Sequence, residues 1–203
     1  MSTETPNLDP YVSKAQNDKV STHQKIIDLH KIVKAAGTGM LTTRASDGFL
    51  HARAMTPAGP HSDKQLTLFF IANKVSGKIA EVENDAHVNV SFLDTASTSW
   101  ASYSGTAHIV TDKSVIKQHW STLMSAYFGD LGDGVHKGDE NDPRVIAIEV
   151  VPDDIVYWLA TSGAISRTVH AAIGAFTGHG TAPGELRELK KEEIQLTQTA
   201  EAK

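Results

Sequence analysis

The sequence predicts an α+β fold in which an antiparallel β-sheet or barrel is flanked by helices. Segments with the alternating pattern of strands come in groups of two or three, and helical segments separate the groups. The short turns within the groups suit hairpins, whereas a parallel sheet needs a long crossover between neighbouring strands. The chain has 203 residues, which is enough for one domain of ordinary size.

The individual elements follow from the spacing of apolar residues and from turn residues. Ile26, Leu29 and Val33 recur at helical spacing ahead of Gly37, a residue type that suits a helix C-cap. Ser46-Asp47-Gly48 has the composition of a hairpin turn. In chain order the predicted elements are a helix over about 21–37, strands over 40–43, 49–56 and 65–72, a helix over 76–84, strands over 87–94 and 100–110, a helix over 112–128, a loop over 129–143, strands over 145–151 and 155–159, and a helix over 162–177.

Interruptions within the strands and the two chain ends complete this organisation. Gly105 predicts a bulge or bend in its strand, and Pro152-Asp153-Asp154 is expected to separate the last two strands. Residues 1–20 are polar and contain two prolines, so we expect a mobile arm there. We assign one domain to residues 21–189. Residues 190–203 are expected to be a flexible tail, and the charged residues that lead into it to be half ordered at best.

Composition and charge argue against several classes of function. The formal net charge of −5 is unlike that of a nucleic-acid-binding domain, which usually carries a basic surface. The chain has no cysteine, which excludes thiol catalysis, disulfides and cysteine-rich zinc sites. Its polar start does not resemble a signal peptide, and no apolar run reaches the roughly 20 residues of a membrane span. We therefore expect a cytoplasmic protein with no nucleic-acid or membrane partner.

The segment 72–79, with the sequence ANKVSGKI, is a candidate phosphate site. A predicted strand ends there, and after a short turn a helix begins at Ser76, where unpaired amide N–H groups and the helix dipole favour an anion. Ser76 adds a hydroxyl, Gly77 lets the backbone approach a ligand closely, and Lys78 adds a cation. The alternative is that Ser76 is only an N-cap and Lys78 only a solvated lysine. The segment taken alone favours this alternative.

Arg53, in the sequence HARAMT, is a second candidate for binding an anion. On a strand Arg53 shares one face with Met55. The other face carries small and apolar residues, namely Leu50, Ala52 and Ala54. We expect that face to meet the core and Arg53 to point outward, either to solvent or into a groove. Taken alone, an arginine on a strand is more often a plain surface residue.

Other kinds of chemistry have little support in the residue patterns. The histidines form no HExxH motif, and several of them fall on separate predicted elements, so we expect no metal site. These are His51, His61, His87, His108 and His119. The chain has no G-x-S-x-G elbow, no G-x-x-x-x-G-K-[ST] loop and no strand-linked G-x-G-x-x-G. We assign no catalytic residue.

Four segments together resemble a known family. They read MLTTRASDGFLHARAM, LFFIANKVSGKIAEVENDAHVNVSFLD, YSGTAHIVTDKSVIKQHW and DPRVIAIEVVPDDIVYW. In this order they are similar to the general stress protein branch of the pyridoxamine 5′-phosphate oxidase-like, FMN-binding split β-barrels, with fungal blue-light-induced proteins as relatives. The resemblance runs from Ser21 to Leu189. It implies a split barrel that binds FMN at the interface of a homodimer.

The resemblance also implies roles for particular residues. Arg53 would contact the phosphate or the ribityl chain of the flavin, and Ser76 with Lys78 would hold the phosphate. The other implied contacts are backbone groups of Ala54 and Met55, the segment Ile71-Ala72 along the isoalloxazine ring, Gly77 beside the phosphate, and Trp100 and Trp158 covering the flavin across the dimer. Core packing is an equally good explanation for the two tryptophans.

Two departures from the family pattern bear on activity. The oxidases carry an arginine-lysine pair where this chain has Gly77-Lys78, and they carry an arginine–x–histidine motif where this chain reads Ile155–Leu159. We therefore do not expect genuine pyridoxamine phosphate oxidation. The implied function is FMN binding, with FAD or a deazaflavin also compatible and with weak NAD(P)H-dependent flavin reduction as the activity. The alternatives are a non-catalytic flavin carrier or stress sensor, and a barrel without cofactor that serves as an interaction module.

The family resemblance also predicts where two copies would pair. Phe92, Trp100 and Tyr103 lie on or beside long predicted strands that need covering. We expect these three aromatic residues to line an apolar homodimer interface.

Overall fold

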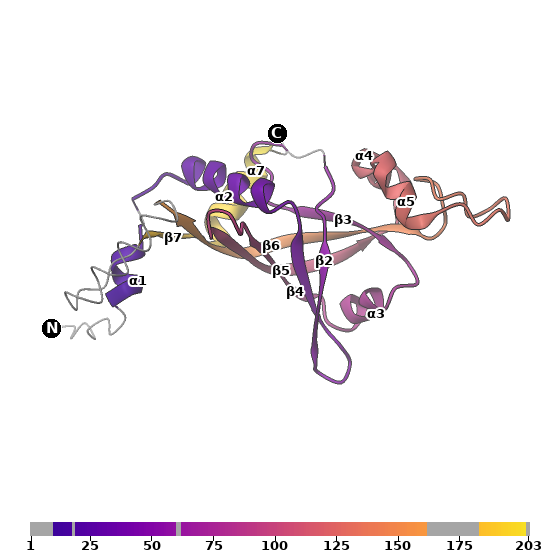
Figure 1. Ribbon diagram of the computed structural model, residues 1–203, viewed down its shortest axis with the longest axis horizontal. Coiled ribbons are helices and arrows are strands. Elements are labelled where there is room, and N and C mark those ends of the chain that lie inside the picture. Colours follow the sequence, from indigo (N-terminus) through magenta and orange to yellow (C-terminus); the bar gives the residue numbers. More distant parts are fainter. Residues whose placement is uncertain (1–9, 18, 60–61, 162–182, 202–203) are drawn as a thin grey trace.

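The computed structural model describes residues 10–17, 19–59, 62–161 and 183–201 (Figure 1). Its strands are β1 (Gly39–Arg44), β2 (Leu50–Met55), β3 (Leu68–Asn73), β4 (His87–Leu93), β5 (Trp100–Val110), β6 (Val145–Ala160) and β7 (Gly184–Leu189). Its helices are α1 (Pro10–Ala15), α2 (Thr22–Ala36), α3 (Gly77–Asn84), α4 (Lys113–His119), the 3-10 turn η1 (Thr122–Met124), α5 (Ser125–Phe128) and α7 (Lys191–Glu201).

The strands form one antiparallel sheet in the order β2-β1-β4-β5-β6-β3, with β7 paired to β6. The sheet curves so that β2 crosses β3 and β6 steeply in Figure 1. β2 and β3 end the strand path, and the loop after β2 reaches β3 through a hydrogen bond of 2.6 Å from the Ala58 amide to the Phe69 carbonyl. The prediction of an antiparallel barrel with peripheral helices is confirmed.

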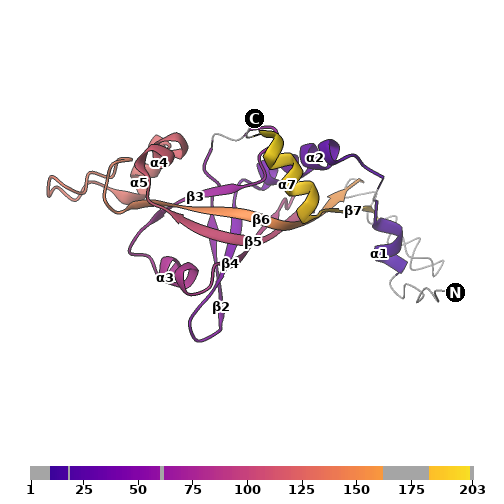
Figure 2. The same cartoon turned by 180° about the vertical axis from the view of Figure 1, so that it is seen from behind.

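One main core fills the curved sheet. Phe70, Val90 and Ile148 are fully buried in it, and α2 and α7 pack on the same side, as the reverse view in Figure 2 also shows. A smaller cluster joins Ile116 on α4 to Ile71, Val145 and Ala147 on the sheet, and Phe128 of α5 packs against it. α3 lies at the other end of the curved sheet from α2 (Figures 1 and 2), and its Ile79 and Val82 are buried in the same main core.

Most predicted boundaries agree with the structure. Ser21 caps α2 by accepting a hydrogen bond from the Gln24 amide, and Gly37 ends the helix with a positive φ of 67°. The predicted irregularity at Gly105 is confirmed by a register shift between β5 and β6 at Ser104/Gly105. A Cβ on Gly105 would lie 2.1 Å from the Val151 carbonyl oxygen, so no larger residue fits without movement of the backbone.

Two predicted elements differ in the structure. β6 continues through Pro152 without a break, because the register shift at Gly105 lies opposite this proline, and strands tolerate proline at such irregularities. The single helix expected over 112–128 is divided at Trp120, whose ψ of 137° is extended. Ser121 then starts a new turn by accepting a hydrogen bond from the Leu123 amide, a local bond that competes with helix continuation.

The chain ends hold structure that the residue patterns did not reveal. Part of the expected arm forms α1, the segment expected to be half ordered forms β7, and α7 lies within the expected tail, with Leu189 and Ile194 buried. Ion pairs join this region to α2: Arg187 contacts Asp28 at 2.6 Å, and Lys25 contacts Glu193, which is partly exposed, at 3.0 Å. The helix predicted over 162–177 lies outside the described residues. The domain boundaries at residues 21 and 189 stay a prediction.

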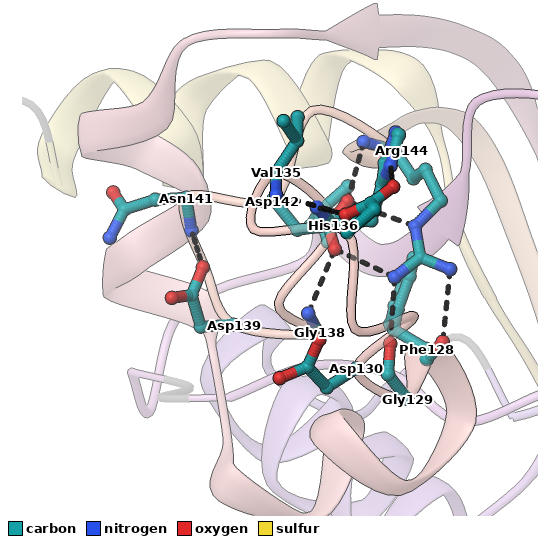
Figure 3. A network of polar contacts seen from close by, with 12 residues as sticks. Phe128, Gly129, Asp130, Val135, His136, Gly138, Asp139, Asn141, Asp142 and Arg144 are labelled. Atoms are coloured by element: carbon teal, nitrogen blue, oxygen red, sulfur yellow. Dashed lines mark hydrogen bonds and ion pairs between the residues drawn. The ribbon is translucent and has the colours of Figure 1, made fainter.

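The loop between α5 and β6 is closed at its base by one ion pair (Figure 3). Asp142 is fully buried and lies 2.7 Å from the Arg144 guanidinium, which also donates to the carbonyls of Phe128 and Gly129. The Gly138 amide donates to the Asp142 carboxylate at 2.8 Å. Hydrogen bonds with Arg144 hold the pKa of Asp142 well below its usual range. The Asp142–Arg144 ion pair, which we call the clamp, is therefore charged at neutral pH.

Candidate functional site

Arg53 lies on the inner side of β2, contrary to the prediction. Its side chain is 24% exposed and Met55 packs against the main core, whereas Leu50 is 68% exposed and Ala52 and Ala54 are exposed as well. The prediction placed the small apolar residues inside. β2 is an edge strand, and its inner face meets β1 and α3, which supply polar partners for an arginine.

The guanidinium group of Arg53 is held by three contacts. It donates to the Thr43 hydroxyl at 2.5 Å, to the Leu41 carbonyl at 3.3 Å and to the Glu81 carboxylate at 2.6 Å. An arginine has more N–H donors than these contacts use, so the group keeps donors for a further acceptor. Arg53 is therefore oriented by β1 and α3.

Glu81 on α3 gathers this group of side chains. Its carboxylate accepts from the Thr43 hydroxyl and from Arg53, and it lies 2.6 Å from His51 Nδ1. Burial alone would raise the pKa of Glu81, but the hydrogen bonds from Thr43, His51 and Arg53 lower it to about 2. The carboxylate is therefore ionised at neutral pH and partly offsets the charge of Arg53.

Ser76 and Lys78, at the start of α3, lie near the group formed by Thr43, Arg53 and Glu81. We call this place, between β1, β2 and the start of α3, the corner. Ser76 occupies the N-cap position but makes no side-chain cap bond; its hydroxyl donates to the Asn73 carbonyl at 2.7 Å. Lys78 Nζ donates to the Ser76 hydroxyl oxygen at 3.0 Å. The simple reading of Ser76 as a side-chain cap therefore fails. Lys78 is half-buried, and its ammonium makes no ion pair among the described residues.

Electrostatics shows that the two predicted cations lie near each other. Burial lowers the pKa of Lys78, the charge of Arg53 lowers it further, and Glu81 opposes this effect. Lys78 and Glu81 are three residues apart, so they share one face of α3. Arg53, Lys78 and one carboxylate leave a net positive corner, and an anion placed there would gain two cationic donors.

Gly77 leaves room for such an anion. A Cβ on Gly77 would have no atom within 4 Å, so no packing inside the chain requires a glycine at this position. Its φ is not in the left-handed region, so the turn does not require a glycine either. The open space lies at the first residue of α3, beside the helix amides that have no partner within the helix. Hydroxyl, ammonium, guanidinium and amide donors together suit a phosphate group.

The other predicted site residues lie elsewhere. Ile71 is buried in the smaller cluster, Ala72 is buried in the main core, and Ala54 is exposed on the outer face of β2. Trp100 pairs with Trp158 across β5 and β6. Their side chains share the sheet face of Ala54, because strand residues directly opposite each other point the same way. Within one chain they therefore lie across the sheet from Arg53.

Two participants of the cluster, Thr43 and Glu81, were missed from the sequence, and His51 was considered only as a metal ligand. The spacing of Glu81 from Lys78 on the predicted helix was a usable signal, since it places both on one face. No local sequence pattern indicated a role for Thr43.

The described residues contain no group of three or more histidine or acidic side chains able to hold a metal ion. None of the described helices combines the length and the apolar character needed to cross a membrane.

Comparison with known proteins finds a family and a relative that match this chain. Residues 24–181 match a family model described as pyridoxamine 5′-phosphate oxidase like. The protein bli-3 of Neurospora crassa is 38% identical over 188 residues, which make up 92% of this chain and 90% of that protein.

Solved structures share the fold at lower identity. General stress protein 26 of Bacillus anthracis is 23% identical, with a TM-score of 0.54 over 66% of this chain and 93% of that chain. A pyridoxamine 5′-phosphate oxidase-related, FMN binding protein of Nostoc punctiforme is 12% identical, with a TM-score of 0.51 over 64% and 80% of the two chains. The curved sheet of this chain is thus a split β-barrel.

Proposed function

Since this chain belongs to the pyridoxamine 5′-phosphate oxidase-like family, we propose that it binds a flavin nucleotide and holds the phosphate between β2 and the start of α3. One observation carries the proposal. Arg53 and Lys78, which are 25 positions apart in the chain (78 − 53), approach the same corner, and the Lys78 ammonium makes no ion pair within the described part of the chain. An unpaired, half-buried ammonium beside a guanidinium favours an anionic ligand.

FMN is the flavin that we propose. The residues at this corner supply hydrogen-bond donors and positive charges that suit a phosphate. The Nostoc punctiforme relative is described as FMN binding. FAD also carries a phosphate at this distance from the flavin ring, so it is the second choice. Bound flavin supplies the redox chemistry, while this chain supplies position and charge. Ser76, Gly77 and Lys78 would hold the phosphate and Arg53 would orient it. Ala54, Met55, Ile71 and Ala72 would offer mainly backbone groups to the rest of the flavin.

We propose that two copies of the chain pair through the outer face of the sheet. Exposed apolar side chains share this face: Met40 is 42% exposed, Leu93 57% and Trp100 36%. Leu50 and the exposed alanines of β2 extend the same surface. Large apolar patches of this kind mark interaction sites. Phe92 and Tyr103 were predicted to be part of the interface, but each is 1% exposed in the core, so that part of the prediction is wrong.

The activity that we propose is weak NAD(P)H-dependent reduction of the flavin in the cytoplasm. The alternative is a non-catalytic flavin carrier. It draws on one observation: His51 and Glu81, two titratable groups beside Arg53, are already paired with each other. Anaerobic mixing of the flavin-loaded protein with NADPH separates the two functions. Bleaching of the flavin absorbance supports the reductase, and an unchanged spectrum with NADPH and NADH supports the carrier.

The phosphate site is tested by Lys78→Ala. Loss of a charge-assisted hydrogen bond worth about 1.5–3 kcal/mol should weaken FMN binding roughly 10- to 150-fold. Riboflavin has no phosphate, so its affinity should stay nearly constant. Titration of apoprotein with both ligands gives the ratio.

Lys74→Ala is the matched control, because Lys74 is exposed on the turn that precedes α3. It should leave both affinities unchanged. Stability of both variants should stay within about 0.5 kcal/mol of the original protein, as for other substitutions away from the core. An unaltered FMN-to-riboflavin ratio in the Lys78→Ala protein would refute the proposed phosphate site.

A further inference from the structure

A cavity of about 480 Å³ lies between α2 and the segment that joins β2 to β3. It lies at the α2 end of the curved sheet, whereas the phosphate corner lies at the α3 end (Figure 1), and no residue lines both. Val33, Pro57 and Leu68 supply apolar walls. The volume falls in the range of about 300–1,000 Å³ that small-molecule sites occupy.

Tyr103 places an unused hydroxyl in this cavity. Its side chain is 1% exposed, and its ring packs edge-on against Phe92 with centroids 5.7 Å apart. Within the described part of the chain the Tyr103 hydroxyl has no hydrogen-bond partner, and the residue lines the cavity. By contrast, the buried hydroxyl of Tyr157 donates to the Lys25 carbonyl at 2.9 Å. The Tyr103 hydroxyl is not among the fully buried polar atoms that lack a partner in the described residues, so it reaches the space of the cavity, where an acceptor atom of a ligand could take the place of water.

The side chains that line the cavity indicate which kind of ligand it can bind. Burial raises the pKa of Tyr103, so the hydroxyl stays protonated and acts as a donor. His30 Nε2 lies 2.7 Å from the Gln65 carbonyl, so this nitrogen carries the proton and is already used. Lys34 and Asp63 add one charge of each sign to the lining, so the cavity favours neither anions nor cations. A neutral ligand with an apolar body and an acceptor oxygen fits these groups.

We propose that the cavity binds a small, neutral, cyclic or aromatic carbonyl compound whose oxygen accepts a hydrogen bond from Tyr103. The apolar walls cover the ring of the ligand, and Tyr103 at the inner end selects the carbonyl group. This site is separate from the flavin site and does not depend on it.

Acetophenone and ethylbenzene form a matched pair of probes, because they have nearly the same size and differ in the carbonyl oxygen. Both are titrated into the ¹⁵N-labelled full-length protein, and amide shifts of Val33, Lys34 and Leu68 report on binding. Acetophenone should bind saturably and more tightly than ethylbenzene. Tyr103→Phe should weaken acetophenone about 2- to 12-fold, the value of a neutral hydrogen bond, and should remove the preference over ethylbenzene.

Two further variants serve as controls. Tyr157→Phe also removes a buried hydroxyl, but one that bonds within the core, and it should leave the preference intact. Val33→Phe adds a ring to the cavity wall and should abolish binding of both probes while the amide spectrum stays that of a folded protein. The proposal is wrong if neither probe shifts these amides in the original protein, or if Tyr103→Phe keeps the preference for acetophenone.

Discussion

The carboxylate of Glu81 joins three elements, since it contacts Thr43 on β1 and both His51 and Arg53 on β2 from its place on α3. The stability that these contacts give the folded chain therefore depends on the ionisation of Glu81, and so on pH. The pKa of Glu81 is about 2 in the folded chain, compared with 4.5 for an unperturbed glutamate. Because the folded value is the lower one, the stabilisation is complete above about pH 4.5 and is lost as the pH falls toward 2.

Glu81→Gln should lower the free energy of unfolding at pH 7 by about 1–2 kcal/mol, because the hydrogen bonds of an ionised acceptor are replaced by weaker ones. The difference from the original protein should shrink between pH 4.5 and pH 2. Urea unfolding at several pH values measures it. Glu83→Gln, an exposed change on the same helix, should have no such effect. A difference that stays constant over this range would contradict the assignment.

The residues of the corner could be predicted from the sequence only where the signal is local. Ser76, Gly77 and Lys78 are adjacent at a helix start, a place whose unpaired amides favour anions in any fold. Thr43 and Glu81 are 38 positions apart, so no local pattern connects them. The direction of Arg53 was predicted wrongly because the apolar side of β2 is exposed in the single chain.

The pairing of β5 with β6 depends on one glycine, at the point where the register shifts. Gly105→Ala should destabilise the protein by about 1–3 kcal/mol, because the new Cβ would lie 2.1 Å from the Val151 carbonyl oxygen, and backbone must move to admit it. Thermal unfolding measures the change. Gly77→Ala is the control: its Cβ meets open space at the start of α3, so stability should not fall. Equal melting temperatures for both variants would refute this account.

The other elements show which sequence patterns are sufficient to predict a helix or a strand. The alternation in β4 and the apolar spacing in α2 were enough to place both, since each buries one face on a single core. β7 has an alternating sequence too, GELREL, but its charges hid it. Arg187 is buried against Asp28, and burial of such a pair can only be recognised once α2 and β7 are adjacent.

At the scale of the whole molecule, the apolar outer face of the sheet predicts a stable dimer. Leu50→Glu places a charge on this face, where Leu50 is 68% exposed and therefore contributes little to the fold of one chain. The variant should remain folded and sediment as a monomer at micromolar concentration. Leu123→Glu, on the 3-10 turn beside α5 with 74% exposure, should leave the dimer intact. A folded original protein that already sediments as a monomer would eliminate the paired arrangement.

The closed base of the loop between α5 and β6 has a consequence for limited proteolysis. The tip is held by its own bonds, from the Leu131 amide to the His136 carbonyl and between Asp133 and His136, while Asp142 and Arg144 hold the base without them. Leu131 and Val135 at the tip are exposed. A protease that cuts there would separate the chain into two covalent pieces while the Asp142–Arg144 clamp still joined them to one body. The nicked protein should therefore migrate as two fragments in denaturing gels and as a single particle in native ones.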